Sequence, residues 1–149
     1  MPSKLPSKRE LTAPCGIDCF NCPVYEGLIT DVMSQRLAAQ LGIEPDTVPC
    51  RGCREQQGCR LSWTSCATLD CATERGVEFC YECAGFPCAM LQPVAAAAPP
   101  YPHNIKLYNL CRIKAVGVER WAEEEAAAIR RRYFEGKFVV GQGPVLEEV

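Results

Sequence analysis

The stretch APCGIDCFNCP, residues 13–23, begins a cysteine-rich region that decides how this chain can fold. It contains the first of three Cys-x-x-Cys pairs; the others are CRGC at residues 50–53 and CYEC at residues 80–83. Residues 14–92 hold eleven of the twelve cysteines but few large aliphatic side chains. Such a segment cannot bury enough apolar surface to offset its chain entropy unless covalent or metal cross-links hold it. The cysteines are the candidates for those cross-links.

The choice between disulfides and metal depends on the compartment. The first eleven residues, MPSKLPSKREL, are charged and lack the apolar core of a signal peptide. No stretch approaches the roughly 18 consecutive apolar residues that cross a membrane. We therefore expect a cytoplasmic protein with no membrane segment, in a reducing compartment where thiols are free to bind metal. Disulfides stay open as an alternative, since a mature secreted protein also lacks its signal.

Three Cys-x-x-Cys pairs with further cysteines nearby form a strong metal-binding pattern, because a tight turn directs both sulfurs of a pair to one tetrahedral ion. We expect two or three zinc ions by this pattern. The expected ligands are Cys15, Cys19, Cys22, Cys50, Cys53, Cys59, Cys66, Cys71, Cys80, Cys83 and Cys88. One pairing by spacing joins Cys50, Cys53, Cys66 and Cys71 in one site and Cys19, Cys22, Cys80 and Cys83 in a second. Cys15, Cys88 and Cys59 then remain for a third site with His103.

Three residues are ambiguous as ligands. Cys59 lies between the pairs and is either a ligand or an exposed thiol. His103, the only histidine, precedes an expected helix, where a lone histidine is more often a surface or capping residue than a ligand. Cys111 falls on the apolar side of that helix, so we predict a small buried hydrophobic residue there.

An iron–sulfur electron carrier is the main alternative, because thiolates bind iron and zinc alike. Pro23 directly after Cys22 resembles the end of a ferredoxin cluster motif. The spacing of Cys15, Cys19 and Cys22 also resembles radical S-adenosylmethionine enzymes, but the chain lacks the strand–helix alternation of their barrel. A thioredoxin-like site is disfavoured because no strand precedes CFNC. No phosphate loop, His-Glu-x-x-His motif or credible triad is present, so the sequence favours a protein that is not an enzyme.

The charge balance disfavours nucleic acid as a partner. The formal net charge is −2 before any cysteine is counted as a thiolate. Because zinc ligands are deprotonated, each four-thiolate zinc site adds a further charge of about −2. Arg51, Arg54 and Arg60 lie among the cysteines, and we expect them to offset thiolate charge and to donate hydrogen bonds to sulfur.

The elements between the cysteines predict a mainly α, metal-stapled domain with irregular loops and a short extended C-terminal tail. Residues 1–13 are expected to be a flexible leader and residues 14–149 a single domain. Within that domain, the cysteine-rich region spans 14–92, a Pro/Ala-rich strap 93–102, a helical region 103–136 and the tail 137–149. Helical spacing predicts helices over 24–41, 65–75, 105–115 and 118–134. The strap and the tail are also candidate contacts for a protein partner.

The chain resembles a family of small cysteine-rich prokaryotic proteins described as a domain of unknown function and suspected of binding zinc. The resemblance lies in CGIDCFNCPVY at 15–25, CRGC at 50–53 and SCATLDCATERGVEFCYECAGFPC at 65–88. It extends over most of residues 13–115, including NIKLYNLCRIKAVGVERW. At Trp63, many relatives carry a cysteine. The resemblance implies metal binding and an intracellular location, and it implies no activity.

Overall fold

A computed structural model describes residues 4–59, 66–91 and 103–136, without the side chains of His103 and Asn104. The chain is mainly helical, as the sequence predicts. The elements run in the order η1 (Cys19–Asn21), α1 (Asp31–Leu41), η2 (Pro45–Thr47), α2 (Cys53–Gln56), α3 (Ala67–Glu74), η3 (Cys80–Glu82), η4 (Ala89–Leu91), α4 (His103–Val116), α5 (Val118–Arg120), the π-helical turn η5 (Trp121–Glu125) and α6 (Ala126–Glu135). In the described residues, β-type pairing is limited to two isolated bridges, Thr12 with Asp18 and Tyr25 with Cys50. The predicted strap and tail lie outside the described residues.

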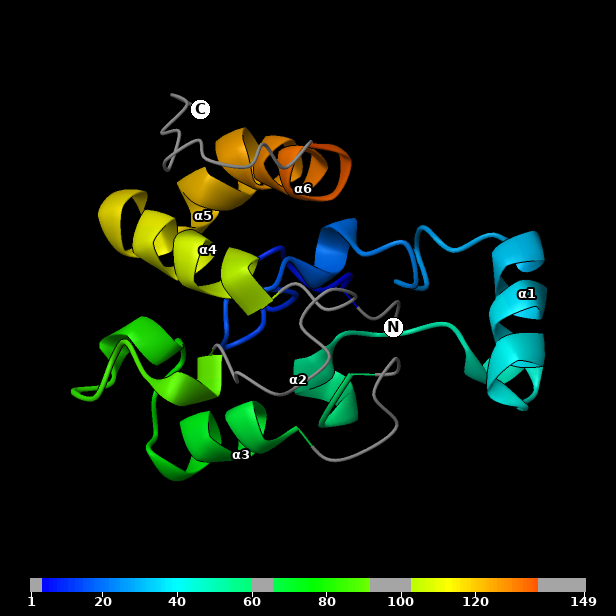
Figure 1. Ribbon diagram of the computed structural model, residues 1–149, viewed down its shortest axis with the longest axis horizontal. Coiled ribbons are helices and arrows are strands. Elements are labelled where there is room, and N and C mark those ends of the chain that lie inside the picture. Colours follow the sequence, from blue (N-terminus) through cyan, green and yellow to red (C-terminus); the bar gives the residue numbers. More distant parts are fainter. Residues whose placement is uncertain (1–3, 60–65, 92–102, 137–149) are drawn as a thin grey trace, which may run out of the picture.

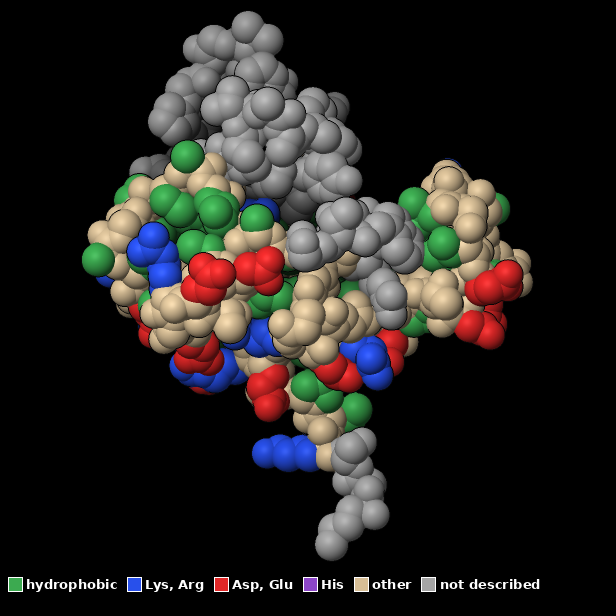
Figure 2. Space-filling model, turned by 90° about the horizontal axis from the view of Figure 1, so that it is seen from below, with side chains coloured by type: hydrophobic (Ala, Val, Ile, Leu, Met, Phe, Trp, Pro, Cys, Tyr) green, Lys and Arg blue, Asp and Glu red, His purple; other side chains and the backbone are tan. Residues whose placement is uncertain are grey.

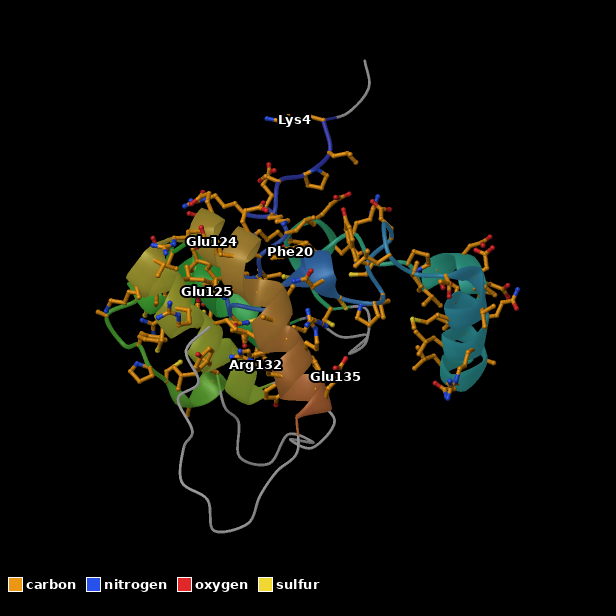
Figure 3. All side chains as sticks on the ribbon, turned by 90° about the horizontal axis from the view of Figure 1, so that it is seen from above. Lys4, Phe20, Glu124, Glu125, Arg132 and Glu135 are labelled. Atoms are coloured by element: carbon orange, nitrogen blue, oxygen red, sulfur yellow. The ribbon has the colours of Figure 1, made fainter. Side chains whose placement is uncertain are left out.

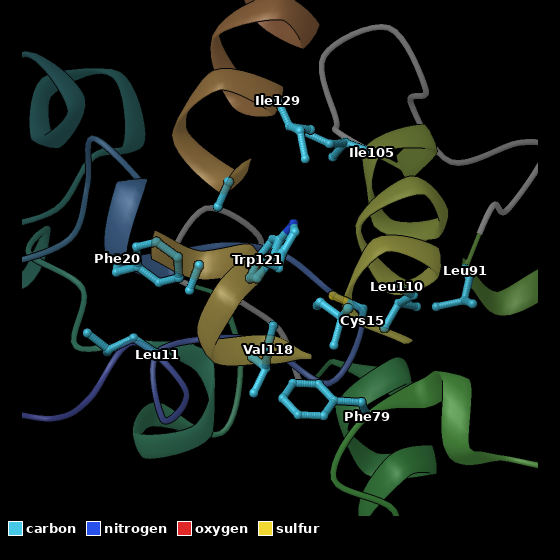
Figure 4. Packing of buried hydrophobic residues seen from close by; sticks show 14 residues of the cluster. Leu11, Cys15, Phe20, Phe79, Leu91, Ile105, Leu110, Val118, Trp121 and Ile129 are labelled. Carbon is cyan, nitrogen blue, oxygen red and sulfur yellow. The ribbon is translucent and has the colours of Figure 1, made fainter. Parts of the chain in front are cut away.

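Most buried side chains belong to one hydrophobic cluster, which we call the body cluster. Figure 4 shows its centre, where Trp121 meets Phe20 edge to face at a ring-centroid distance of 6.1 Å. Helix α4 contributes Leu110 and Ile113, and residues of the cysteine-rich region cover the opposite side. The full cluster consists of Leu11, Ala13, Cys15, Phe20, Phe79, Leu91, Ile105, Leu110, Ile113, Val118, Trp121, Ala122, Ala126 and Ile129. The cysteine-rich region and the C-terminal helices therefore share one core. Residues 11–13, at the end of the expected leader, are buried in or beside it.

Helix α4 lies directly on the first cysteine loop. Asn109 is fully buried and its amide Nδ2 donates to the carbonyl oxygen of Gly16 at 2.8 Å. A Cβ at Gly16 would meet the carbonyl oxygen of Lys106 at 3.0 Å and Leu110 Cγ at 3.1 Å, and the φ of Gly16 is +87°. Glycine is needed here both for its backbone conformation and for this close approach.

The C-terminal helix is the element that the sequence predicts best. The segment from α5 through η5 to α6 covers residues 118–135, against 118–134 predicted. Helical spacing predicts one buried side made of Val118, Ala122, Glu125 or Ala126, Ile129 and Tyr133. The structure buries this side as far as Ile129, whereas Tyr133 is exposed. Arg112 of α4 makes two hydrogen bonds to the Glu125 carboxylate, at 2.7 and 2.8 Å, which joins α4 to this segment.

Helix α1 begins seven residues later than predicted. Thr30 caps it by accepting a hydrogen bond from the Met33 amide, and residues 24–30 form turns instead of a first helical turn. The reason is tertiary: the Val24 carbonyl and the Glu26 amide both bond to the backbone of Cys50, at 2.8 Å each. Helical spacing over 24–41 predicts an apolar side made of Val24, Leu28, Val32 (or Ile29), Leu37 and Leu41. Val24 is buried, but Leu28, Val32 and Leu41 are exposed, so this side is not a continuous core face.

Helix α1 lies at one end of the molecule, apart from α3 to α6 (Figures 1 and 3). In the space-filling view it forms a separate lobe (Figure 2). A second, small hydrophobic cluster holds this lobe together and consists of Val24, Ala38 and Val48, with partly buried side chains around them. We call residues 23–49 the arm and this group the arm cluster.

Candidate metal centres

The Cys19–Cys22 pair is formed by a 3-10 turn at the junction between the arm and the rest of the molecule. The Cys22 amide donates to the Cys19 carbonyl at 3.0 Å, and the Tyr25 amide donates to the Cys22 carbonyl at 2.9 Å. After the arm, the chain returns beside this turn, because the Cys50 amide donates to Val24. Two Cys-x-x-Cys pairs far apart in sequence are thus brought together.

The thiols at this junction, Cys19, Cys22, Cys50 and Cys53, are neighbours, and we call them the first group. A hydrogen bond between the thiols of Cys19 and Cys53, together with burial, raises the pKa of Cys19 well above its usual value. Burial is the main cause that raises the pKa of Cys22, and the nearby thiols of Cys19 and Cys50 add to it. The guanidinium of Arg130 acts in the opposite direction on Cys22.

A second group of thiols surrounds Cys80. The Cys80 amide donates to the Pro14 carbonyl at 2.9 Å, which ties this pair to the loop that carries Cys15. Burial raises the pKa of Cys80 to about 12, with smaller contributions from neighbouring thiols. Those neighbours are Cys15, Cys88, Cys71 and Cys83. Cys15 is buried, its pKa is raised by burial to about 11, and Cys66 is among its neighbours. The second group is therefore Cys15, Cys66, Cys71, Cys80, Cys83 and Cys88.

Several sulfurs accept hydrogen bonds from donors that the local backbone directs at them. The Gly52 amide donates to Cys50 Sγ at 3.4 Å, and the Gly85 amide donates to Cys83 Sγ at 3.4 Å. In both cases the donor is two residues after the cysteine. The amides of Ile17 and Val24 stand in the same relation to Cys15 and Cys22 and favour their thiolate forms. Donors of this kind stabilise sulfur that carries negative charge.

Two side chains add to these amide donors. Gln56 Nε2 donates to Cys50 Sγ at 3.3 Å. Arg75 donates to Cys83 Sγ at 3.5 Å and also hydrogen-bonds the Cys71 thiol. Sequence reasoning missed both residues, although Gln56 lies three positions after Cys53 and Arg75 four after Cys71.

The arginines expected at the sulfurs have other contacts. Arg54 donates to the carbonyl oxygens of Thr12 and Glu78. Arg51 pairs with Glu55 at 3.2 Å. The arginine that donates hydrogen bonds to cysteine sulfurs is instead Arg75. Arg60 lies outside the described residues.

The turns at Cys19–Cys22 and Cys80–Cys83 repeat the same backbone. Each is a 3-10 turn in which the second cysteine amide donates to the first cysteine carbonyl, at 3.0 and 3.2 Å. The second cysteine has φ −71° and ψ 129° in one turn and φ −70° and ψ 137° in the other. A residue three positions on, Tyr25 or Phe86, then donates to its carbonyl. The sequence shows no repeat beyond the cysteine spacing and an aromatic residue after the first cysteine.

The structure distributes the predicted ligands differently from the pairing by spacing. Cys50 and Cys53 lie with Cys19 and Cys22, whereas Cys80 and Cys83 lie with Cys71. Cys59 is exposed and belongs to neither of the two thiol groups defined above. Cys111 is exposed, so the prediction of a buried residue is wrong; α4 turns Leu110 and Ile113 to the core instead. The side chain of His103 is not among those described.

The thiols are grouped, but they are not arranged as a formed metal site. Among residues 4–59, 66–91 and 103–136, no three Cys, His, Asp or Glu side chains are placed so that they could hold a metal ion. An ion bound by either group therefore requires side chains to rotate toward it. Within the same residues, no disulfide joins two cysteines.

Fold and thiol arrangement together define a small, mainly helical, cysteine-rich protein. The chain belongs to the family DUF3795, proteins of unknown function, whose model matches residues 11–93. This region contains every cysteine except Cys111; the expected extension of the resemblance to residue 115 is not part of the match. No curated protein and no solved structure matches the chain. In the described part of the chain, no helix has the length and apolar character needed to cross a membrane.

Proposed function

We propose that this protein binds zinc through its two groups of cysteine thiolates and that the ions are structural. The observation that carries the proposal is the set of N–H donors directed at cysteine sulfurs within both groups. A neutral thiol is a weak acceptor and does not need such donors, whereas a metal-bound thiolate does. Shells made only of cysteine are typical of closed structural zinc sites.

The raised thiol pKa values of Cys15, Cys19 and Cys80 have a consequence for this proposal. Without metal, these thiols are neutral at pH 7, so zinc has to displace their protons. We expect proton release on zinc addition, approaching one proton per ligand thiol. Calorimetric titrations in buffers of different ionisation enthalpy measure this number.

The test of the proposal is elemental analysis of protein purified without oxygen. We expect about two zinc ions per chain, and loss of the far-ultraviolet helical signal when a strong chelator removes them. The Cys111→Ser variant serves as a control and keeps the full zinc content, because Cys111 lies in neither group. Less than one metal ion per chain overturns the proposal. Iron with acid-labile sulfide in place of zinc overturns it in favour of an iron–sulfur protein.

We also propose that the protein binds another protein. This proposal depends on the strap and the tail predicted from the sequence, and both lie outside the described residues. Deletion of the strap in a pull-down assay tests it.

A further inference from the structure

The two hydrophobic clusters meet at the first group of thiols. The body cluster contains fully buried side chains such as Trp121 and Leu110, and the arm cluster contains Val24, Ala38 and Val48. The two clusters have no buried residue in common. The arm, residues 23–49, is therefore a small packing unit of its own. It is joined at both of its ends to the rest of the described molecule, which we call the body.

The four thiols of the first group divide evenly between the two clusters. Cys19 and Cys53 pack against the body cluster. Cys22 and Cys50 pack against the arm cluster. Each cluster thus supplies one cysteine from the outgoing chain segment and one from the returning segment.

The backbone at this junction already holds the returning segment beside the outgoing one. The Cys50 amide and carbonyl bond to Val24 and Glu26 at 2.8 Å each, and the thiol of Cys19 reaches the thiol of Cys53. These contacts hold the two segments side by side at the four thiols, and rotation of the cysteine side chains would then bring two sulfurs from each segment to one tetrahedral ion. The ion pair of Arg130 with Asp18, at 2.6 Å, adjoins this group: Arg130 lowers the pKa of Cys22, whereas Asp18 raises the pKa of Cys19.

We propose that Cys19, Cys22, Cys50 and Cys53 bind one zinc ion as a four-thiolate site and that this ion fixes the arm to the body. The inference rests on the proposed zinc binding, and it adds the ligand set and its position between two packing units. An ion bound by the second group does not have this effect, since Cys80 and Cys15 lie against the body cluster.

The ligand set is tested by counting zinc ions in single and double variants. Cys22→Ser and Cys50→Ser each lose about one ion per chain relative to the native protein. The double variant C22S/C50S loses the same single ion, because both residues bind it. The double variant C22S/C83S loses about two ions, because its cysteines belong to different groups. If C22S/C50S loses two ions, the two residues bind different ions and the ligand set is wrong.

A measurement on the native protein covers the case in which a variant does not fold. Zinc is withdrawn stepwise with a chelator, and reactive thiols are alkylated and identified by mass spectrometry. Cys19, Cys22, Cys50 and Cys53 should become reactive together as one set. Release of Cys50 and Cys53 together with Cys66 and Cys71 contradicts the ligand set.

Hydrogen exchange measures whether the first-group ion holds the arm in place. Loss of the first-group ion in C22S should speed amide exchange in α1 by about tenfold or more and leave α4 unchanged. Loss of the second-group ion in C83S should leave α1 unchanged. If C22S loses an ion and α1 exchanges at the native rate, the ion does not fix the arm. Absence of zinc from the native protein is a separate outcome and refutes zinc binding itself.

Discussion

Replacing Trp121 tests the body cluster most directly. The side chain is fully buried between Phe20 and the C-terminal helices, yet its indole Nε1 has no hydrogen-bond partner among the described residues. A buried tryptophan removes about 150–250 Å² from water, which at about 25 cal/mol per Å² corresponds to roughly 4–6 kcal/mol. Trp121→Ala should therefore lower the free energy of unfolding by about 3–5 kcal/mol.

Trp121→Phe separates apolar burial from the unpaired indole donor. It keeps a ring against Phe20 and removes an N–H group whose burial without a partner costs about 1–3 kcal/mol. The two effects partly cancel, so we expect a loss below about 1.5 kcal/mol. Leu5, which is 84% exposed, provides the control, and Leu5→Ala should change stability by less than about 0.5 kcal/mol.

The assay is urea unfolding followed by circular dichroism at a fixed excess of zinc, since bound metal contributes to apparent stability. Similar losses for Trp121→Phe and Trp121→Ala would refute the reasoning, because they would mean that the indole N–H is itself bonded. A loss below about 1 kcal/mol for Trp121→Ala would show that the cluster is not packed as described.

Three further substitutions test local features of the fold. Arg112 lowers the pKa of Glu125, so this ion pair stabilises the protein at pH values above the ordinary glutamate pKa of about 4.3. Its contribution is lost as the pH falls through the lower pKa that Glu125 has in the folded state. The stability difference between the native protein and Glu125→Gln, measured from urea midpoints, should therefore shrink below pH 4, and a difference that grows there contradicts the prediction. Gly52 has φ +97°, and a Cβ added there would lie 3.1 Å from a methyl carbon of Leu11, whereas Gly42 has φ +69° and open space around the same position. Gly52→Ala should therefore lower the free energy of unfolding by about 1–3 kcal/mol in urea, and Gly42→Ala by about 1 kcal/mol. A larger loss for Gly42→Ala than for Gly52→Ala would be inconsistent with the structure. Thr30→Ala removes the cap of α1 and should cost about 1 kcal/mol locally, seen as faster hydrogen exchange in α1 with α4 as the unaffected reference.

The helical class and the C-terminal helix could be predicted because local sequence determines them. Val118, Ala122 and Ile129 recur at helical spacing, and Gly117 and Gly136 mark the ends of the segment. The start of α1 could not be predicted in this way. Val24 has helical spacing with later apolar residues, but its carbonyl accepts a hydrogen bond from Cys50, and that partner is invisible to local periodicity.

The sequence predicts the cysteines as candidate ligands, which stays a prediction, but it does not predict which of them the structure brings together. Spacing identifies Cys-x-x-Cys pairs, because the turn that joins two such cysteines is local. It does not say which pairs meet, because the Tyr25–Cys50 bridge forms only after the arm has folded back. Cys111 was misplaced for a related reason: Leu110 and Ile113 fix the rotation of α4, and a small thiol one position from Leu110 then faces solvent.

The close contact of Asn109 and Leu110 with Gly16 bears on where this protein can be divided. The family match ends at residue 93, yet the side chains that cover Leu11, Phe20, Phe79 and Leu91 come from helices that begin after it. A fragment that stops at the end of the match would leave half of the shared core uncovered and would be prone to aggregate. Any protein that buries the same side chains in the same way needs an equivalent cover beyond the matched region.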